Sequence, residues 1–86
     1  MILISFKPTF VRQMNKLEKD LADEVFEKIE LFKNDKNHNS LKVHKLHGKM
    51  LGRFSFSVNY KYRIVFKYEQ KNQAVLLDIG DHDMYK

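Results

Sequence analysis

One stretch of the sequence constrains the fold more than any other: FSFSVNYKYRIVFKY, residues 54–68. Phenylalanines alternate with serines in its first half, and aromatic or aliphatic residues alternate with mostly basic ones in its second half. Alternation with a period of two, in β-branched and aromatic residues, is typical of half-buried strands. Residues 59–61 between the halves are few enough to connect antiparallel neighbours. The stretch therefore predicts a two-stranded ribbon with one apolar face, and Arg63 on the other face beside Ser55 and Ser57.

Two amphipathic helices are predicted before this ribbon. Pro8 suits the first turn of a helix, where its missing N–H has no intrahelical partner. Apolar residues then recur every three or four positions, as one face of a helix requires, at Phe10, Met14, Leu17 and Leu21. We expect a break near residues 19–20, with Asp20 as the N-cap of the second helix. The expected buried residues of that helix are Leu21, Val25, Phe26, Ile29 and Phe32. Such short helices need an apolar support, and the ribbon is the expected one.

Further strands complete the expected sheet. Residues 2–6 are apolar enough to lie inside a sheet, and residues 41–46 suggest a short edge strand followed by a tight turn between two glycines. Residues 70–73 suggest a hairpin turn, and residues 74–79 are nearly all apolar, as in a central strand covered on both faces. The predicted class is α+β: two N-terminal helices packed on a mainly antiparallel four- to five-stranded sheet.

The totals favour a single soluble domain. A chain of 86 residues has room for one core, so residues 1–86 are expected to form one domain. The absence of cysteine excludes disulfides and thiolate metal sites. The apolar run at the N-terminus is too short for a signal peptide or a membrane span, so we expect a cytoplasmic protein. The sequence has no G-x-G-x-x-G motif or P-loop, which argues against a nucleotide cofactor.

The charge is distributed unevenly along the chain. Residues 1–40 contain seven basic and seven acidic residues, whereas residues 41–86 contain nine basic and four acidic ones and so carry the whole net charge of +5. A basic half beside a neutral half suggests a polyanion as partner, most often a nucleic acid. A merely solubilising surface is the alternative.

Two residues are the first candidates for chemistry. Arg63 carries a permanent charge in a strand of apolar and aromatic residues; the alternative is a solvent-facing arginine paired with Asp78. His82 follows the last strand between Asp81 and Asp83. Neighbouring carboxylates favour a protonated histidine, which could donate a proton near neutral pH; the alternative is an exposed terminal histidine.

The remaining candidates are aromatic or basic. Tyr85 could stack on an unpaired base, or be idle at the end of the chain. A basic segment beside the ribbon could hold phosphates or be a solvated turn; it comprises His44, Lys45, His47, Lys49 and Arg53. The spacing of the histidines matches no zinc motif, so no metal is expected.

Two segments, LKVHKLHGKMLGRFSFSVNYKYRIVF and VLLDIGDHDMY, resemble the RelE/ParE superfamily of bacterial toxins from type II toxin–antitoxin pairs. The resemblance covers essentially the whole chain and implies the RelE-like fold. In the RelE, YoeB and YafQ branches it implies an endoribonuclease that cuts mRNA in the ribosomal A site without a cofactor. In the ParE branch it implies inhibition of DNA gyrase. It also implies a cognate antitoxin, which is acidic and suits a basic face.

The resemblance also assigns roles to single residues. Arg63 falls where the RNA-cleaving members keep a phosphate-binding arginine, and His82 where some keep a catalytic histidine and others an arginine. Tyr85 matches a C-terminal catalytic tyrosine of RelE, and His44 resembles the first active-site histidine of the YafQ branch.

The sequence departs from the family pattern on the ribbon. Ser57 stands where the YafQ branch keeps a second histidine, and Lys61 replaces its nearby aspartate. The strand lysines of RelE fall at or near Ser55 and Ser57. The general base is therefore left between His44 and Tyr85.

The expected reaction is attack of a ribose 2′-OH on the adjacent phosphate, which only RNA permits. Arg63 would stabilise the transition state and His82 would act as the general acid. The residues expected to guide the RNA backbone are Lys45, Lys49, Arg53 and Lys61. Two other functions stay open: a ParE-like toxin that inhibits gyrase without catalysis, and a plain RNA-binding module. Against the second, the chain lacks an RNP-type strand motif and a G-x-x-G clamp.

Overall fold

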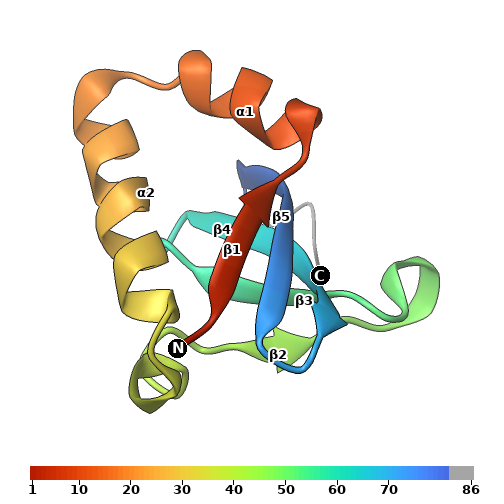
Figure 1. Ribbon diagram of the computed structural model, residues 1–86. Helices are drawn as coiled ribbons and strands as arrows, with labels where there is room; N and C mark the ends of the chain where they lie inside the picture. The colour runs from red at the N-terminus through yellow and green to blue at the C-terminus, as the bar shows by residue number, and fades with distance from the viewer. Residues whose placement is uncertain (82–86) are drawn as a thin grey trace.

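The strands and helices of the computed structural model, which describes residues 1–81, follow the predicted order (Figure 1). They are β1 (Leu3–Phe6), α1 (Pro8–Asn15), α2 (Lys19–Phe32), β2 (His44–Lys45), β3 (Phe54–Ser57), β4 (Tyr62–Gln70) and β5 (Gln73–Asp81). Two short 3-10 turns, η1 (Asp35–Asn37) and η2 (Gly48–Met50), flank β2. Both helices precede all but one of the strands, which confirms the α+β class. No helix in this described part combines the length and apolarity needed to cross a membrane.

The five strands form one sheet in the order β1-β5-β4-β3-β2. β1 pairs with β5 in parallel, and every other pair is antiparallel. The ribbon predicted from the alternation is β3 and β4, and the central position expected for residues 74–79 is that of β5. The expectation that residues 2–6 lie inside the sheet is wrong. β5 already pairs with β4 on its other side, so β1 is left as an edge strand whose Leu3 is 64% exposed.

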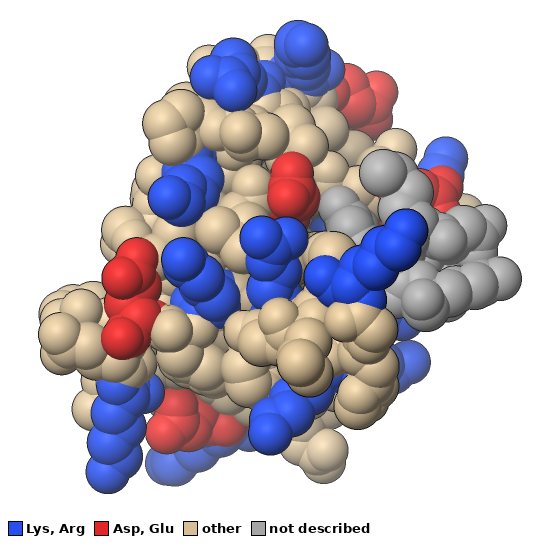
Figure 2. Space-filling model, turned by 90° about the vertical axis from the view of Figure 1, so that its right-hand side faces the viewer, with Lys and Arg blue, Asp and Glu red and all other residues tan. Residues whose placement is uncertain are grey.

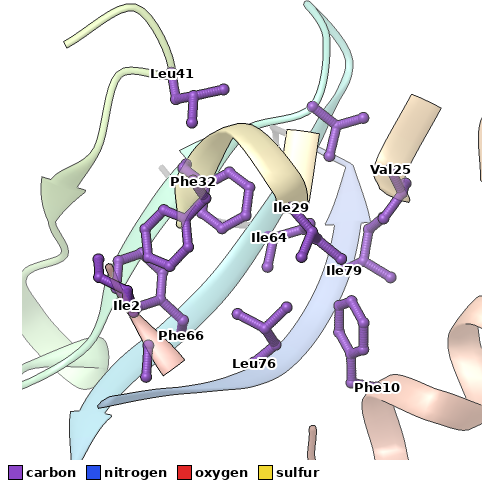
Figure 3. Close-up of a cluster of buried hydrophobic side chains, with 13 residues drawn as sticks. Ile2, Phe10, Val25, Ile29, Phe32, Leu41, Ile64, Phe66, Leu76 and Ile79 are labelled. Carbon is purple, nitrogen blue, oxygen red and sulfur yellow. The ribbon is translucent and has the colours of Figure 1, made fainter. Parts of the chain in front are cut away.

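The main core lies between the helices and one face of the sheet. In Figure 3, apolar side chains from α1, α2, β4 and β5 converge between the layers. Phe32 at the end of α2 lies near their centre, with its ring stacked on Phe56 at 4.5 Å and edge-on to Phe66 at 4.7 Å. His38, which follows α2, stacks on the opposite side of Phe32 at 4.7 Å. The ribbon is therefore the support for the helices, as the sequence predicted.

Two details of α2 differ from expectation. The helix begins at Lys19, so Asp20 lies in its first turn rather than at the N-cap, where the acidic side chain still favours the helix dipole. Val25, Ile29 and Phe32 form the buried stripe, but Phe26 is 56% exposed. One residue advances a helix by about 100°, so Phe26 lies at the margin of this stripe, where it lines an open hollow with Leu3 and Phe6 of the edge strand β1.

A smaller apolar cluster covers part of the other face of the sheet. It consists of Leu46, Val65, Val75 and Leu77, with Met50 of η2 packed against it. β5 thus buries side chains on both of its faces, as its nearly continuous apolar sequence indicated. The loop that brings Met50 over this face begins and ends at glycines in the left-handed region, Gly48 (φ 68°) and Gly52 (φ 86°), as expected for a tight turn.

Candidate active site

Arg63 lies on the face of the sheet that the helices leave uncovered. It is paired with Ser57 across β3 and β4, and its guanidinium donates a hydrogen bond to the Ser57 hydroxyl. Ile64 on the next position is buried in the helix-side core, so alternation fixes Arg63 on the opposite face. The arginine beside the serines is therefore confirmed. A strand with neighbours on both sides is a rigid support for a charged group.

His44 lies on the same face, at the edge of the sheet. It pairs with Ser55, and its Nε2 is 3.5 Å from the Ser55 hydroxyl. Its Nδ1 is 2.8 Å from the carbonyl oxygen of Lys42. A carbonyl oxygen only accepts hydrogen bonds, so Nδ1 must carry the proton. In the neutral ring, Nε2 therefore keeps its lone pair and can accept a proton.

The backbone next to His44 has an unusual conformation. Lys42 has φ 58°, the only left-handed non-glycine residue among those that the structure describes. This conformation costs a non-glycine residue about 1–2 kcal/mol. It is accompanied by the bond from His44 to the Lys42 carbonyl, which fixes the tautomer of the ring. Nothing in the sequence pattern indicates this conformation, because lysine is rarely found there.

Arg63 and His44 are separated by β3. Two strand spacings of ~4.8 Å and a shift of two residues place their Cα atoms roughly 12 Å apart. Ser55 and Ser57 lie between them on the same face. The cation and the candidate base therefore flank a strip of two small hydroxyl side chains, of which Ser55 is fully buried and Ser57 half-buried.

The surroundings of this strip are basic. Figure 2 views the molecule from the side away from α2, where several Lys and Arg side chains lie in a row across the middle of the surface, with an acidic group just above the row and others toward the edges. Three ion pairs join residues within 1–81, all between α-helical residues or at the end of α2. None involves Arg63, so the alternative of an Arg63–Asp78 pair is wrong. The Asp78 carboxylate instead accepts a hydrogen bond from Gln13 of α1.

The four residues expected to guide RNA lie in different places. Arg53 contacts Met50 through its guanidinium, at 4.0 Å from the sulfur, beside the apolar cluster of the uncovered face. Lys49 is exposed in η2 nearby. Lys45 pairs with Phe54, whose side chain packs on the helix side, so alternation turns Lys45 away from His44.

Lys61 lies apart from the other three. Its ammonium is 5.5 Å from the centroid of the Tyr62 ring, and Tyr62 packs against the helix-side core. It lines a cavity of about 570 Å³ between the β3–β4 connection and the start of α2. Glu18, Asp20 and Glu24 line the same cavity, so this position is less basic than the face that carries Arg63.

Two predicted site residues, His82 and Tyr85, lie outside the described residues, and their roles stay predictions. Within residues 1–81, no three His, Asp or Glu side chains gather as potential metal ligands. The structure thus brings together Arg63, His44 and two serines, and adds Gln13 and Lys42 as neighbours of the site that sequence patterns did not indicate.

Solved structures with this fold are found despite low sequence identity. YafQ from E. coli superimposes with a TM-score of 0.73 at 17% identity, covering 98% of this chain and 97% of that one. The YoeB–YefM complex from Staphylococcus aureus gives a TM-score of 0.72 at 17% identity (95% and 98% covered). The toxin–antitoxin complex RelBE2 from Mycobacterium tuberculosis gives 0.70 at 20% identity (94% and 98% covered).

Similarity is not detectable by sequence in the other comparisons: no protein-family model and no curated protein matches the chain. The structural matches nevertheless span almost the full length of both partners and include the helices as well as the sheet. The chain therefore has the fold of the toxins of toxin–antitoxin pairs, the RelE-like fold shared by RelE, YoeB and YafQ.

Proposed function

We propose that residues 1–86 form a single toxin domain of a type II toxin–antitoxin pair, and that it is a ribosome-dependent mRNA endoribonuclease of the cytoplasm. One observation carries the proposal: Arg63, anchored by Ser57, and His44, with Nε2 unprotonated in the neutral ring, lie on the same face of the sheet, on either side of Ser55 and Ser57. A phosphate-binding cation and a base on one rigid face are the elements that RNA cleavage requires. The fold supports the same assignment.

The proposed reaction is an internal transesterification. A base removes the proton of a ribose 2′-OH, and the 2′-oxygen forms a bond to the adjacent phosphorus. The bond from phosphorus to the 5′-oxygen of the next nucleotide breaks, and an acid protonates that oxygen. The products are a 2′,3′-cyclic phosphate and a 5′-OH end. No metal or cofactor takes part in this proposal.

His44 is the better candidate for the base among the described residues. The Lys42 carbonyl fixes the proton on Nδ1, and a separation of 3.5 Å from the Ser55 hydroxyl makes Nε2 only weakly engaged. A 2′-OH could therefore replace Ser55 as the partner of Nε2. Tyr85 is the alternative base, and could also orient a nucleotide by stacking.

Arg63 would stabilise the charge that develops on the phosphorane oxygens. Its bond to Ser57 fixes one N–H, and a guanidinium has five N–H groups, so donors remain for the phosphate. His82 is proposed as the acid for the 5′-oxygen. Lys49 and Arg53 would attract the RNA backbone to this face, and Lys45 and Lys61 would bind it from outside this face. The same positive charge gives an acidic antitoxin a reason to dock.

The test is primer extension on a defined mRNA, with purified ribosomes present or absent. We expect cuts only with ribosomes, and their loss in Arg63→Ala, His44→Ala and His82→Ala. Arg12→Ala and His47→Ala are the matched controls, because both residues are exposed and neither lies on the strip between Arg63 and His44. Full cleavage by Arg63→Ala and His82→Ala would contradict the proposal.

Non-enzymatic inhibition of DNA gyrase is the second candidate. Ser55 and Ser57 favour this function, because these strand positions carry hydroxyl groups and not the basic side chains that could serve as a general base. If no mRNA is cut under either condition, inhibition of gyrase-catalysed supercoiling by the purified protein would support this second function. If supercoiling is not inhibited either, gyrase inhibition as the function is contradicted.

A further inference from the structure

After Leu76, β5 pairs only with β4 among the strands in residues 1–81. β1 accompanies β5 only as far as Leu76, whose carbonyl accepts a hydrogen bond from the Lys7 N–H at 3.0 Å. Directly after this point β5 contains a bulge, since Val65 of β4 pairs with Asp78 while Phe66 pairs with Leu76. An edge with a bulge needs other partners for its backbone groups.

The side chain of Gln13, from α1, supplies these partners. Its Oε1 accepts a hydrogen bond from the Ile79 N–H at 2.9 Å, and its Nε2 donates one to the Asp78 carboxylate at 3.3 Å. A carboxamide offers one acceptor and one donor in the same plane, as a peptide group does. Gln13 therefore takes the place of a strand residue at the bulge and fixes the direction of the Asp78 side chain.

Asp78 is a close neighbour of Arg63. Arg63 pairs with Gly80 and Val65 pairs with Asp78, so Asp78 is diagonal to Arg63 across the two strands. Ile79 packs in the helix-side core, so alternation places Asp78 on the face of Arg63. Diagonal neighbours are about 7–8 Å apart, within reach of an arginine and a carboxylate, and Gly80 puts no side chain between them. Yet no ion pair joins the two side chains.

We propose that Gln13 is a positioning residue, which holds the Asp78 carboxylate away from Arg63 and so keeps the guanidinium available for phosphate. A carboxylate bound to the guanidinium would occupy the same N–H groups that a phosphate needs. The phosphate part rests on the proposed function. The capture of Asp78 by Gln13 does not, so the two can be tested separately.

The first test is an NMR titration of the Asp78 carboxyl carbon. It compares four proteins: wild type, Arg63→Ala, Gln13→Met and the double variant. Methionine keeps the length of the side chain without hydrogen bonding, and Gln13→Ala is the substitute should the Met variant not fold. We expect loss of Arg63 to raise the pKa of Asp78 more in the Gln13→Met background than in wild type, because the released carboxylate then pairs with Arg63.

Equal effects of Arg63→Ala in both backgrounds would overturn the proposal. Lys67 is the competing cation, since it lies on the same strand and face as Arg63. Lys67→Ala is therefore added to the Gln13→Met background. A rise in the Asp78 pKa on loss of Lys67, and none on loss of Arg63, would also overturn the proposal.

The second test measures binding of a fluorescein-labelled single-stranded RNA by anisotropy. We expect Gln13→Met to raise the Kd for RNA about threefold, the effect of one partly exposed ion pair. Adding Asp78→Asn to the Gln13→Met variant should return Kd to the wild-type value. A purely structural role of Gln13 would give no rescue, which would overturn the proposal. If wild type and Arg63→Ala bind RNA equally, the proposed function fails, while the titration still decides whether Gln13 restrains Asp78.

Discussion

The stacked rings around Phe32 make a sharp prediction about stability. Phe32 is fully buried, lies between His38 and Phe56 with ring planes 7° and 9° from parallel, and meets Phe66 edge-on. Phe26 lies in the same helix but is mostly exposed. The two phenylalanines thus have the same chemistry and secondary structure but opposite environments, and each serves as the control for the other.

The magnitude follows from the packing. Truncation of a buried phenylalanine to alanine costs about 3–5 kcal/mol, whereas a domain of this length has a total stability of about 4–13 kcal/mol. Leucine is the better probe, because it keeps much of the apolar volume and loses chiefly the ring stacking. Each aromatic pair contributes about 0.5–1.5 kcal/mol, so we expect Phe32→Leu to lower the free energy of unfolding by about 2 kcal/mol. Phe26→Leu should change it by less than about 0.5 kcal/mol.

The assay is urea denaturation followed by far-UV circular dichroism. Wild type and the two leucine variants should share one slope m, so that the midpoints report stability directly. Similar losses in both variants would refute the reasoning, because the burial and stacking of Phe32 would then contribute nothing beyond what Phe26 contributes at the surface. A larger loss for Phe26→Leu would refute it more strongly.

Three further outcomes are expected. Burial, and secondly the Asp35 carboxylate, raise the pKa of Tyr68 above its usual 10.0. The stabilising contribution of the neutral Tyr68 hydroxyl is therefore complete below pH ~10 and is lost as the pH rises through the folded-state pKa. Above pH ~10, urea midpoints should therefore fall less in Tyr68→Phe than in wild type. Gly52 has φ 86° and no atom within 4 Å of an added Cβ, so Gly52→Ala should cost about 1 kcal/mol from backbone strain alone, and an unchanged Tm would contradict this. Replacing both Lys49 and Arg53 by alanine should reduce the slope of log K against log salt for single-stranded RNA by about 1.4, and an unchanged slope would show that neither contacts phosphate.

Much of the fold could be predicted because it depends on local periodicity. The alternation in residues 54–68 fixed which side chains of β3 and β4 face the helices, and so placed Arg63 beside Ser57. The same reasoning failed for Phe26 and for β1, for one physical reason. An apolar side chain at the margin of a helical stripe, or an apolar strand, shows that burial is possible, but the tertiary arrangement decides whether a neighbour is present.

The site was predictable only in part. Arg63 and His44 stand out as charged or titratable residues in or beside strands, and the structure places them on one face. The bond between Gln13 and Asp78 joins residues 65 positions apart, and no pattern in the chain connects them. The hydrogen bond that fixes the tautomer of His44 goes to the carbonyl of Lys42, a residue whose left-handed conformation its type does not indicate. His82 and Tyr85 stay predictions.

The parallel pairing of β1 with β5 has a consequence for the order of events during translation. Of the described strands, β1 is synthesised first and β5 last, and Leu3 of β1 pairs with Gln73 of β5. Neither helix can cover a finished sheet until β5 has been synthesised, because β5 lies between β1 and β4. The sheet, and with it the face that carries Arg63, is therefore expected to be completed only after β5 has been synthesised.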